Sequence, residues 1–502
     1  MIQRHIIHKQ KVTLYVNKQE EAHGLQNLVS RLMQNELSDK MESVFAELFP
    51  SDKIIRMDSL HINLANINPA NFEEEFKNGF IAEFRKVLSS KKENLSEANN
   101  EEELSNARSL VLSLIFFLEN GSLPWYRSAK NIADWEEEIT QNLSTGEYEY
   151  LLEWLRHSYY KSTIVLQRLA MQFSDMFLEK LILKILPGQS ISWEDIYTDL
   201  DAVLNVCLNE KKSHRVDIWK YAFHVLLNNS ELDDADKANV WAFQVLKLLA
   251  DRFDISGISS LMEIKLNKKL KTNSIKDAFK ELVAFLDTRG QSHNNIEIKN
   301  KKSRKKRSDQ IKDADNNINK DAAEQLKSKQ NILPEGDAIY VTGSGAVILH
   351  FFLNPFFEDL KLVANGKFVD TEANQRAVLL LHYLVTGETE TAEFNLALQK
   401  ILCGYPLPET LPSSIILTKK EKTESIKLLT AVTDYWVPLK NTSIDGLRSG
   451  FLQREGKLNP KENGWLLTVE QKTLDILLSK IPWGFSTIRL PWMGQILNVD
   501  WY

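Results

Sequence analysis

The chain has 502 residues, 43% of them hydrophobic, and 62 basic against 68 acidic residues give a formal net charge of −6. This length predicts about two to four domains with a sizeable core, and the mild charge excludes an overall surface dedicated to nucleic acid. Cys207 and Cys403 lie far apart, which excludes a disulfide framework and fits a reducing compartment. The N-terminus lacks an apolar signal segment, and no run reaches the ~18 apolar residues of a membrane span, so we expect a cytosolic protein.

Residues 1–90 are predicted to form a small α+β domain. Residues 12–16 and 57–64 alternate with the period of half-buried strands, and residues 23–49 carry apolar side chains at helical spacing. A second helical segment has phenylalanine at every fourth position, namely Phe72, Phe76, Phe80 and Phe84. A cofactor box could have this spacing, but the buried face of an amphipathic helix has it far more often, so we favour packing.

The rest of the chain predicts helical blocks around a polar linker. Residues 104–290 form the predicted helical domain, residues 291–336 are too polar to fold alone, and residues 337–502 form a C-terminal α+β domain with a strand at 339–341. The fold class is therefore mainly α (α+β), with small β elements at both ends and a disordered central linker. The helices expected in the helical domain are 110–118, 135–139, 148–155, 164–183, 216–227, 237–249 and 275–286.

The segment IYVTGSGAVILHFFL resembles a dinucleotide-binding loop because Gly343 and Gly345 stand between a predicted strand and a predicted helix. The position of the third glycine is Ile348, and no second half of a βαβ unit follows. We therefore favour a glycine-flanked helix entry over a nucleotide site.

Other charged clusters give no clear chemistry. Residues 230–236 hold several carboxylates, but Ser230 followed by Asp233 before an apolar run is typical of a helix start. The basic run at 299–307 could contact nucleic acid, yet no aromatic residues interleave with it, and solvated chain is the better interpretation. Histidines and cysteines lack zinc spacing, and no nucleophile elbow is present. We expect no enzyme, no cofactor and no metal.

Tryptophans recur beside prolines, as Pro124-Trp125, Pro482-Trp483 and Pro491-Trp492, and Trp501 stands near the end of the chain. Proline fixes its own φ and biases the preceding residue toward extended backbone, so each pair predicts a corner into which the indole packs. Tryptophan is also favoured as an interface anchor. Trp125, Trp483, Trp492 and Trp501 are therefore candidate interaction residues or, more often, architectural corners.

The end of the chain, IRLPWMGQILNVDWY, is apolar and alternating where a terminus is usually polar. Residues 465–469 and 485–490 are also strand-like and could pair with residues 496–501. We predict that the chain ends on the closing strand of the C-terminal domain, with the Pro491-Trp492 corner before it.

Several segments together form a recognisable pattern. In the first part of the chain they are His5-x-Ile7, the spaced Leu60, Ile62 and Leu64, GSLPWY at 121–126, and R-L-x-x-Q-F from Arg168 to Phe173. In the last part they are residues 346–362, 368–388, 396–408, 433–458 and 465–501. With these segments the chain resembles the tape measure family of extracellular contractile injection systems, the phage-tail-like particles that bacteria assemble. Ala65 departs from the pattern, where the family has glycine after the strand.

The resemblance implies a non-enzymatic assembly protein that sets tube and sheath length. The alternative is a folded adaptor or chaperone at the baseplate, tip or cap of the same particle. It also implies tube, baseplate or cap proteins as partners, and a cytoplasmic location during assembly before incorporation into the particle. As one helix the whole chain would reach about 750 Å, but its proline and glycine breaks indicate folded blocks, so ruler and adaptor both stay open.

Overall fold

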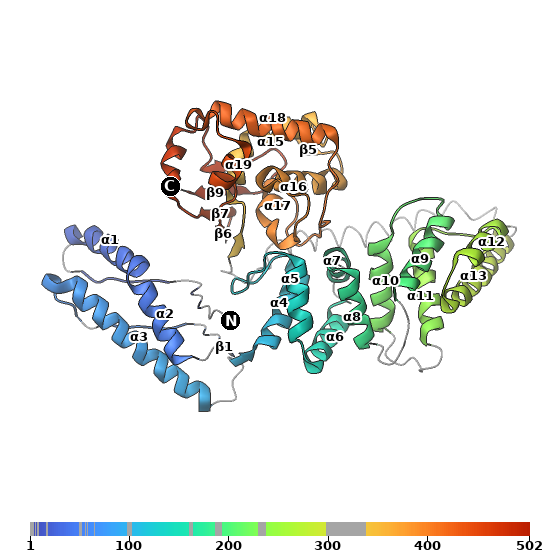
Figure 1. The fold of residues 1–502 in the computed structure, drawn as a ribbon, viewed down its shortest axis with the longest axis horizontal. Helices are drawn as coiled ribbons and strands as arrows, with labels where there is room; N and C mark the ends of the chain where they lie inside the picture. The colour runs from blue at the N-terminus through green and yellow to red at the C-terminus, as the bar shows by residue number, and fades with distance from the viewer. Residues whose placement is uncertain are drawn as a thin grey trace. The chain divides into compact units, whose positions relative to one another are not determined.

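The computed structural model describes residues 5, 7, 10–16, 19–49, 53–55, 57, 59–64, 66–97, 103–159, 164–185, 193–228, 237–297 and 338–501. The chain divides into two compact units, residues 1–113 with 141–147 and residues 114–140 with 148–502. Helices dominate the described residues and the strands are short, so the mainly α fold predicted from the sequence is confirmed (Figure 1). The domain boundaries drawn from the sequence remain predictions.

Helices and one small sheet form the first unit. The helices are α1 (Gln19–Asn35), α2 (Leu37–Leu48) and α3 (Phe72–Glu97), with the 3-10 turn η1 (Pro69–Asn71) before α3. Strand β1 (Lys53–Ile55) pairs antiparallel with β2 (Glu103–Ser105). Successive phenylalanine rings on α3 stack at centroid distances of 5.6, 6.1 and 5.8 Å, and Phe76, Phe80 and Phe84 are buried. The packing role predicted for this stripe is confirmed.

Two segments predicted as strands, residues 12–16 and 57–64, are not strands where the structure describes them. Leu60, Ile62 and Leu64 are half-buried against the core of the first unit, whereas the residues between them are exposed. The alternation therefore came from an extended segment with one packed face. A β-strand forms only where a neighbouring strand shares its backbone hydrogen bonds. Among the described residues of the first unit, the paired strands are β1 and β2.

A run of helices follows in the chain. It comprises α4 (Asn106–Asn120), α5 (Ile132–Asn142), α6 (Thr145–Tyr159), α7 (Ile164–Gln172), α8 (Asp175–Ile185), α9 (Trp193–Cys207), α10 (Arg215–Asn228), α11 (Lys237–Arg252), α12 (Ser260–Lys269) and α13 (Asn273–Glu297). Helices α9 and α12 were not predicted. Helix α13 passes the predicted start of the linker, and residues 298–337, like the predicted cap at 230–236, lie outside the described residues.

The single helix predicted at 164–183 is two helices, because Ser174 interrupts it. The Ser174 hydroxyl accepts a hydrogen bond from the Phe177 N–H at 3.2 Å, which caps the start of α8. The same hydroxyl donates to a carboxylate oxygen of Glu136 at 2.6 Å. Both α7 and α8 bury an apolar face, so the apolar spacing in the sequence continues across Ser174. The spacing alone therefore could not reveal the break between the two helices.

The C-terminal residues combine short helices with a five-stranded sheet. The helical elements are η2 (Ser344–Leu349), α15 (His350–Asp359), α16 (Thr371–Thr386), η3 (Glu393–Asn395), α17 (Ala397–Leu402), α18 (Lys419–Tyr435), η4 (Val437–Leu439), α19 (Ile444–Leu447), η5 (Arg448–Leu452) and η6 (Thr473–Lys480). The strands are β3 (Ile339–Val341), β4 (Val363–Ala364), β5 (Lys367–Phe368), β6 (Gly456–Lys461), β7 (Gly464–Val469), β8 (Thr487–Ile488) and β9 (Ile496–Asp500).

The sheet order is β3-β6-β7-β9-β8, and β4 pairs separately with β5. Strand β9 runs parallel to β7, with Leu467 opposite Val499, and antiparallel to β8. The chain therefore ends on a sheet strand as the sequence predicted, and Pro491 and Trp492 form the turn between β8 and β9.

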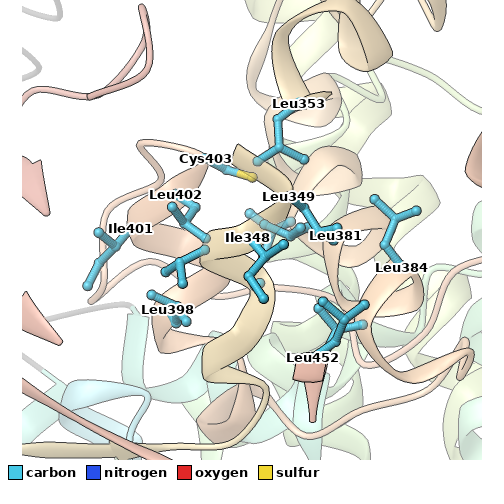
Figure 2. Packing of buried hydrophobic residues seen from close by; sticks show 14 of the residues in the cluster. Ile348, Leu349, Leu353, Leu381, Leu384, Leu398, Ile401, Leu402, Cys403 and Leu452 are labelled. Atoms are coloured by element: carbon cyan, nitrogen blue, oxygen red, sulfur yellow. The ribbon is translucent and has the colours of Figure 1, made fainter. Parts of the chain in front are cut away.

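The core of the C-terminal residues gathers around η2, the segment with the two glycines. Figure 2 shows side chains from η2, α15, α16, α17 and η5 meeting there. A Cβ atom at Gly345 would lie 1.9 Å from the carbonyl oxygen of Phe451, so only glycine lets these backbones approach so closely. Strand β3 pairs antiparallel with β6 and not as part of a βαβ unit. The favoured interpretation, a glycine-flanked helix entry, agrees with this geometry.

Candidate functional site

Of the four candidate tryptophans, Trp501 belongs to the core of the C-terminal residues and Trp492 is partly buried against that core. Trp492 donates its indole N–H to the Leu402 carbonyl at 2.8 Å, and its ring lies 5.1 Å from that of Phe368. Trp501 is 4% exposed and donates to a carboxylate oxygen of Asp475 at 3.1 Å. Both indoles pack in corners of the fold, and Trp492 does so directly after its proline.

Trp483 occupies a different position, at the border of an exposed aromatic surface. Its N–H donates to the Ile348 carbonyl at 3.0 Å, while its ring stacks on Phe351 at 6.1 Å and meets Phe352 edge-on at 5.1 Å. Phe351 is 61% exposed, and Tyr435, whose ring lies 6.2 Å from that of Phe352, is 64% exposed. We call these four residues together with Val437, which is 73% exposed, the aromatic surface.

The backbone order explains why these side chains meet. Phe351 and Phe352 lie in the first turn of α15, Tyr435 ends α18, and Trp483 follows η6. Trp436, between Tyr435 and Val437, is buried and donates its N–H to the Leu477 carbonyl of η6 at 3.1 Å, which fixes the end of α18 against η6. Contiguous exposed apolar area is costly to leave in water, so the aromatic surface is a candidate interaction site. Trp125 is half-buried beside Tyr126 and lies outside this surface.

A buried ionic cluster links α7 to residues more than 200 positions later in the chain. The Arg168 guanidinium binds both carboxylate oxygens of Glu393, from Nε at 3.1 Å and from Nη2 at 3.3 Å. The Lys400 ammonium donates to Oε1 of the same carboxylate at 2.6 Å. The side chains of all three residues are at most 1% exposed. We call Arg168, Glu393 and Lys400 the ionic junction.

Neighbouring groups complete the hydrogen bonding of the ionic junction. Arg168 also donates to the carbonyl oxygens of Leu118 and Pro408. One turn further along α7, Gln172 accepts from the Glu393 N–H at 2.9 Å and donates to the Leu411 carbonyl at 2.7 Å. The charged groups of the ionic junction therefore have hydrogen-bond partners inside the protein. These hydrogen bonds offset the free-energy cost of removing the charges from water.

The ionic junction carries one carboxylate against two cations. Burial lowers the pKa of the Lys400 ammonium, and the nearby Glu393 carboxylate opposes that shift. Geometry favours the charged form, because Nζ has three acceptors, Glu393 Oε1 and the carbonyls of Leu407 and Glu409 at 3.0 and 2.7 Å. An ammonium has three N–H donors for these acceptors, whereas a neutral amine has two.

Apolar and backbone contacts surround the ionic junction. Phe394 places its ring 5.8 Å from Phe117 and 6.0 Å from Trp135, which extends the aromatic core of the helices. Gly121 has φ +71°, and a Cβ there would lie 2.6 Å from the Glu393 carboxylate. Glycine therefore supplies both a left-handed turn and the space for the ion pair.

Two cysteines and one small hollow among the described residues bear on the question of chemistry. Burial raises the pKa of the Cys207 thiol to about 11 and raises that of Cys403 further, so neither is a ready nucleophile. No group of histidine, cysteine and carboxylate side chains among the described residues could hold a metal ion. A small hollow between α9, α10 and α11 is lined by Trp193, Tyr197, Trp219 and mostly apolar neighbours, without converging polar groups.

Comparison with known families decides the assignment. The sequence model described as contractile injection system tape measure protein matches residues 4–501. The chain belongs to this family. Neither the comparison with curated proteins nor that with solved structures found a match. The family is structural, and none of the described helices of this tape measure family member is long and apolar enough to cross a membrane.

Three of the segments that carry the family resemblance converge at the ionic junction of this tape measure family member. GSLPWY contributes Gly121, R-L-x-x-Q-F contributes Arg168 and Gln172, and residues 396–408 contribute Lys400. Nothing in the sequence of these segments indicates that their polar residues meet, and Glu393 lies between two of the segments. Phe351 and Tyr435 could not be predicted as surface residues either, because an exposed aromatic residue on a helix can have the same spacing as a buried one.

Proposed function

We propose that this chain is a non-enzymatic assembly protein of a contractile injection particle, and that it takes part in setting the length of the tube and sheath. The observation that carries the proposal is the family match over residues 4–501. The ionic junction supports a structural role. Its charged groups bind each other and backbone carbonyls, and their side chains are at most 1% exposed, so a substrate could not reach them.

A second candidate, an adaptor at the baseplate, tip or cap, has one specific observation in its favour. The longest helix of the described residues is α3 with 26 residues, which spans only about 39 Å. The described residues thus fold as compact units, and the aromatic surface offers such a body a place to bind a partner.

The experiment that separates the two candidates changes the chain within residues 308–332, which lie outside the described residues. Insertion of 24 residues of similar composition should lengthen a ruler by about 36 Å if helical and by about 80 Å if extended. Particle lengths are measured by electron microscopy, with a scrambled sequence of unchanged length as the control. A proportional length change supports length control, and an unchanged length with normal yield supports the adaptor.

Deletion of the whole chain tests the common part of both candidates. Both require that particles become rare or abnormal in length when the chain is missing. Particles of normal length and yield from the deletion strain would contradict any role in assembly.

A further inference from the structure

Helix α12 exposes apolar side chains beside lysines. Leu261 is 80% exposed and Ile264 is 55% exposed, and Lys265 and Lys268 are exposed beside them. The four positions are related as i, i+3, i+4 and i+7, so they line one face of the helix, which we call the α12 face. The opposite side holds Leu266, which is fully buried, and α12 packs against α9.

The lysines of the α12 face are not neutralised by the described part of the chain. Lys271 nearby pairs with Asp195 at 3.3 Å and Lys280 pairs with Asp277 at 3.0 Å. Among the described residues, no carboxylate lies within ion-pair distance of Lys265 or Lys268. The α12 face therefore combines exposed apolar side chains with positive charges that no described carboxylate neutralises. A partner surface with apolar and acidic side chains would cover the former and pair with the latter.

We propose that the α12 face binds an acidic amphipathic helix of another protein of the injection particle. A helix with apolar side chains at i, i+3 and i+4 flanked by carboxylates would cover Leu261 and Ile264 and place its charges beside Lys265 and Lys268. The proposal rests on membership of the particle and not on length control.

Two other occupants fit the observations less well. An anionic membrane surface needs a helix with a broad apolar face, but α12 already buries Leu266 in the protein and offers only two apolar side chains. A second copy of the chain would need a matching acidic face. The comparable face of α8, with exposed Met176 and Leu183, carries Glu179 and Lys180 and so has no net negative charge.

The test places a photoreactive phenylalanine derivative at position 261 of the full chain, in cells that assemble the particle. Cross-linked peptides are identified by mass spectrometry, and position 176 on α8 serves as the control site. We expect a cross-link at position 261 to a helical, acidic segment of another particle protein, and none to that segment at position 176.

Charge reversal separates binding from folding. Lys265→Glu with Lys268→Glu should lower the cross-link yield about tenfold, because two favourable pairs become repulsive. Lys419→Glu with Lys422→Glu, two exposed lysines at the same spacing on α18, is the matched control and should leave the yield unchanged. Both variants should keep the wild-type melting temperature, because all four side chains are exposed.

Several outcomes would overturn the proposal. They are a cross-link to lipid, to another copy of this chain or to a basic segment, the absence of any cross-link at position 261, and a yield that survives reversal of both lysines. Particle length is measured in the same cells. If reversal of Lys265 and Lys268 lowers the cross-link yield while particle length stays that of the wild type, the result supports binding at the α12 face. The same result would count against a role of this chain in length control.

Discussion

Each of the two units contains a cluster of charged side chains, and the two clusters differ in their exposure to solvent. In the first unit Lys77 binds Glu36 at 2.8 Å and Glu73 at 3.1 Å, with side-chain exposures of 21%, 42% and 45%. In the second unit Arg168, Glu393 and Lys400 make similar contacts with side chains that are at most 1% exposed. The two clusters contain similar charged residues at similar distances, but the first is exposed to water and the second is buried.

Solvent decides how much each cluster contributes to stability. Water and salt screen an exposed pair, which contributes about 0–1 kcal/mol, so the first unit depends on the stacked phenylalanines of α3 instead. A buried cluster gives little net stability when intact, yet loss of one partner leaves a charge without compensation. The comparison predicts a fold in which the second unit is far more sensitive to loss of a charge.

Removal of the central carboxylate should have the largest effect. Glu393→Ala leaves the Arg168 and Lys400 cations facing each other in a buried site, and we expect a loss of about 3–5 kcal/mol in the free energy of unfolding. Urea unfolding of the full chain, followed by hydrogen exchange of α7 and α17, measures the loss. A loss below 1 kcal/mol would show that the ionic junction is hydrated in solution.

Acid should destabilise the second unit through His382. Burial lowers the pKa of this imidazole from 6.5 to about 4, so the unfolded chain takes up a proton that the folded chain does not. Stability is unaffected above pH 6.5, falls as the pH drops below that value, and reaches a total loss of about 3 kcal/mol near pH 4. His382→Gln should flatten this part of the unfolding free energy against pH, and an unchanged slope would assign the acid sensitivity to other groups.

Disruption of the exposed cluster should have a small effect. Lys77→Ala is expected to leave the free energy of unfolding of the first unit close to that of the wild type, because its partners are solvated. The difference from wild type should shrink further in 1 M NaCl, where the Debye length is about 3 Å. A loss of stability as large as that of Glu393→Ala, and independent of salt, would place this cluster in the same class as the ionic junction.

Change of the aromatic surface should affect binding more than stability. Phe351→Ser with Tyr435→Ser removes two side chains that are 61% and 64% exposed, and we expect less than about 1 kcal/mol of destabilisation. Particle yield should fall if this surface binds a partner. Ile416→Ser, at a side chain 91% exposed and outside the surface, is the control. Equal yields from both variants would remove the aromatic surface, and Trp483 with it, as an interaction site.

The predictions from sequence succeeded where periodicity is local. The α3 phenylalanines, the strand at Ile339–Val341 and the closing strand Ile496–Asp500 each follow from side-chain spacing in one segment. They failed where a partner decides the outcome. Residues 57–64 have strand alternation without a strand, and the helix predicted at 164–183 is interrupted at Ser174, whose hydroxyl also donates to Glu136, 38 residues earlier.

The mainly α fold, the apolar faces of the helices and the family of the chain can all be predicted from the amino-acid sequence. The sequence does not show that Arg168, Glu393 and Lys400 share one buried site, that Trp501 is buried in the core, or that Trp483 borders exposed aromatic rings. Helical spacing fixes which side chains share a face of a helix, whereas the residues that cover that face come from distant parts of the sequence. Whether a charge or an aromatic ring is costly or useful depends on that cover.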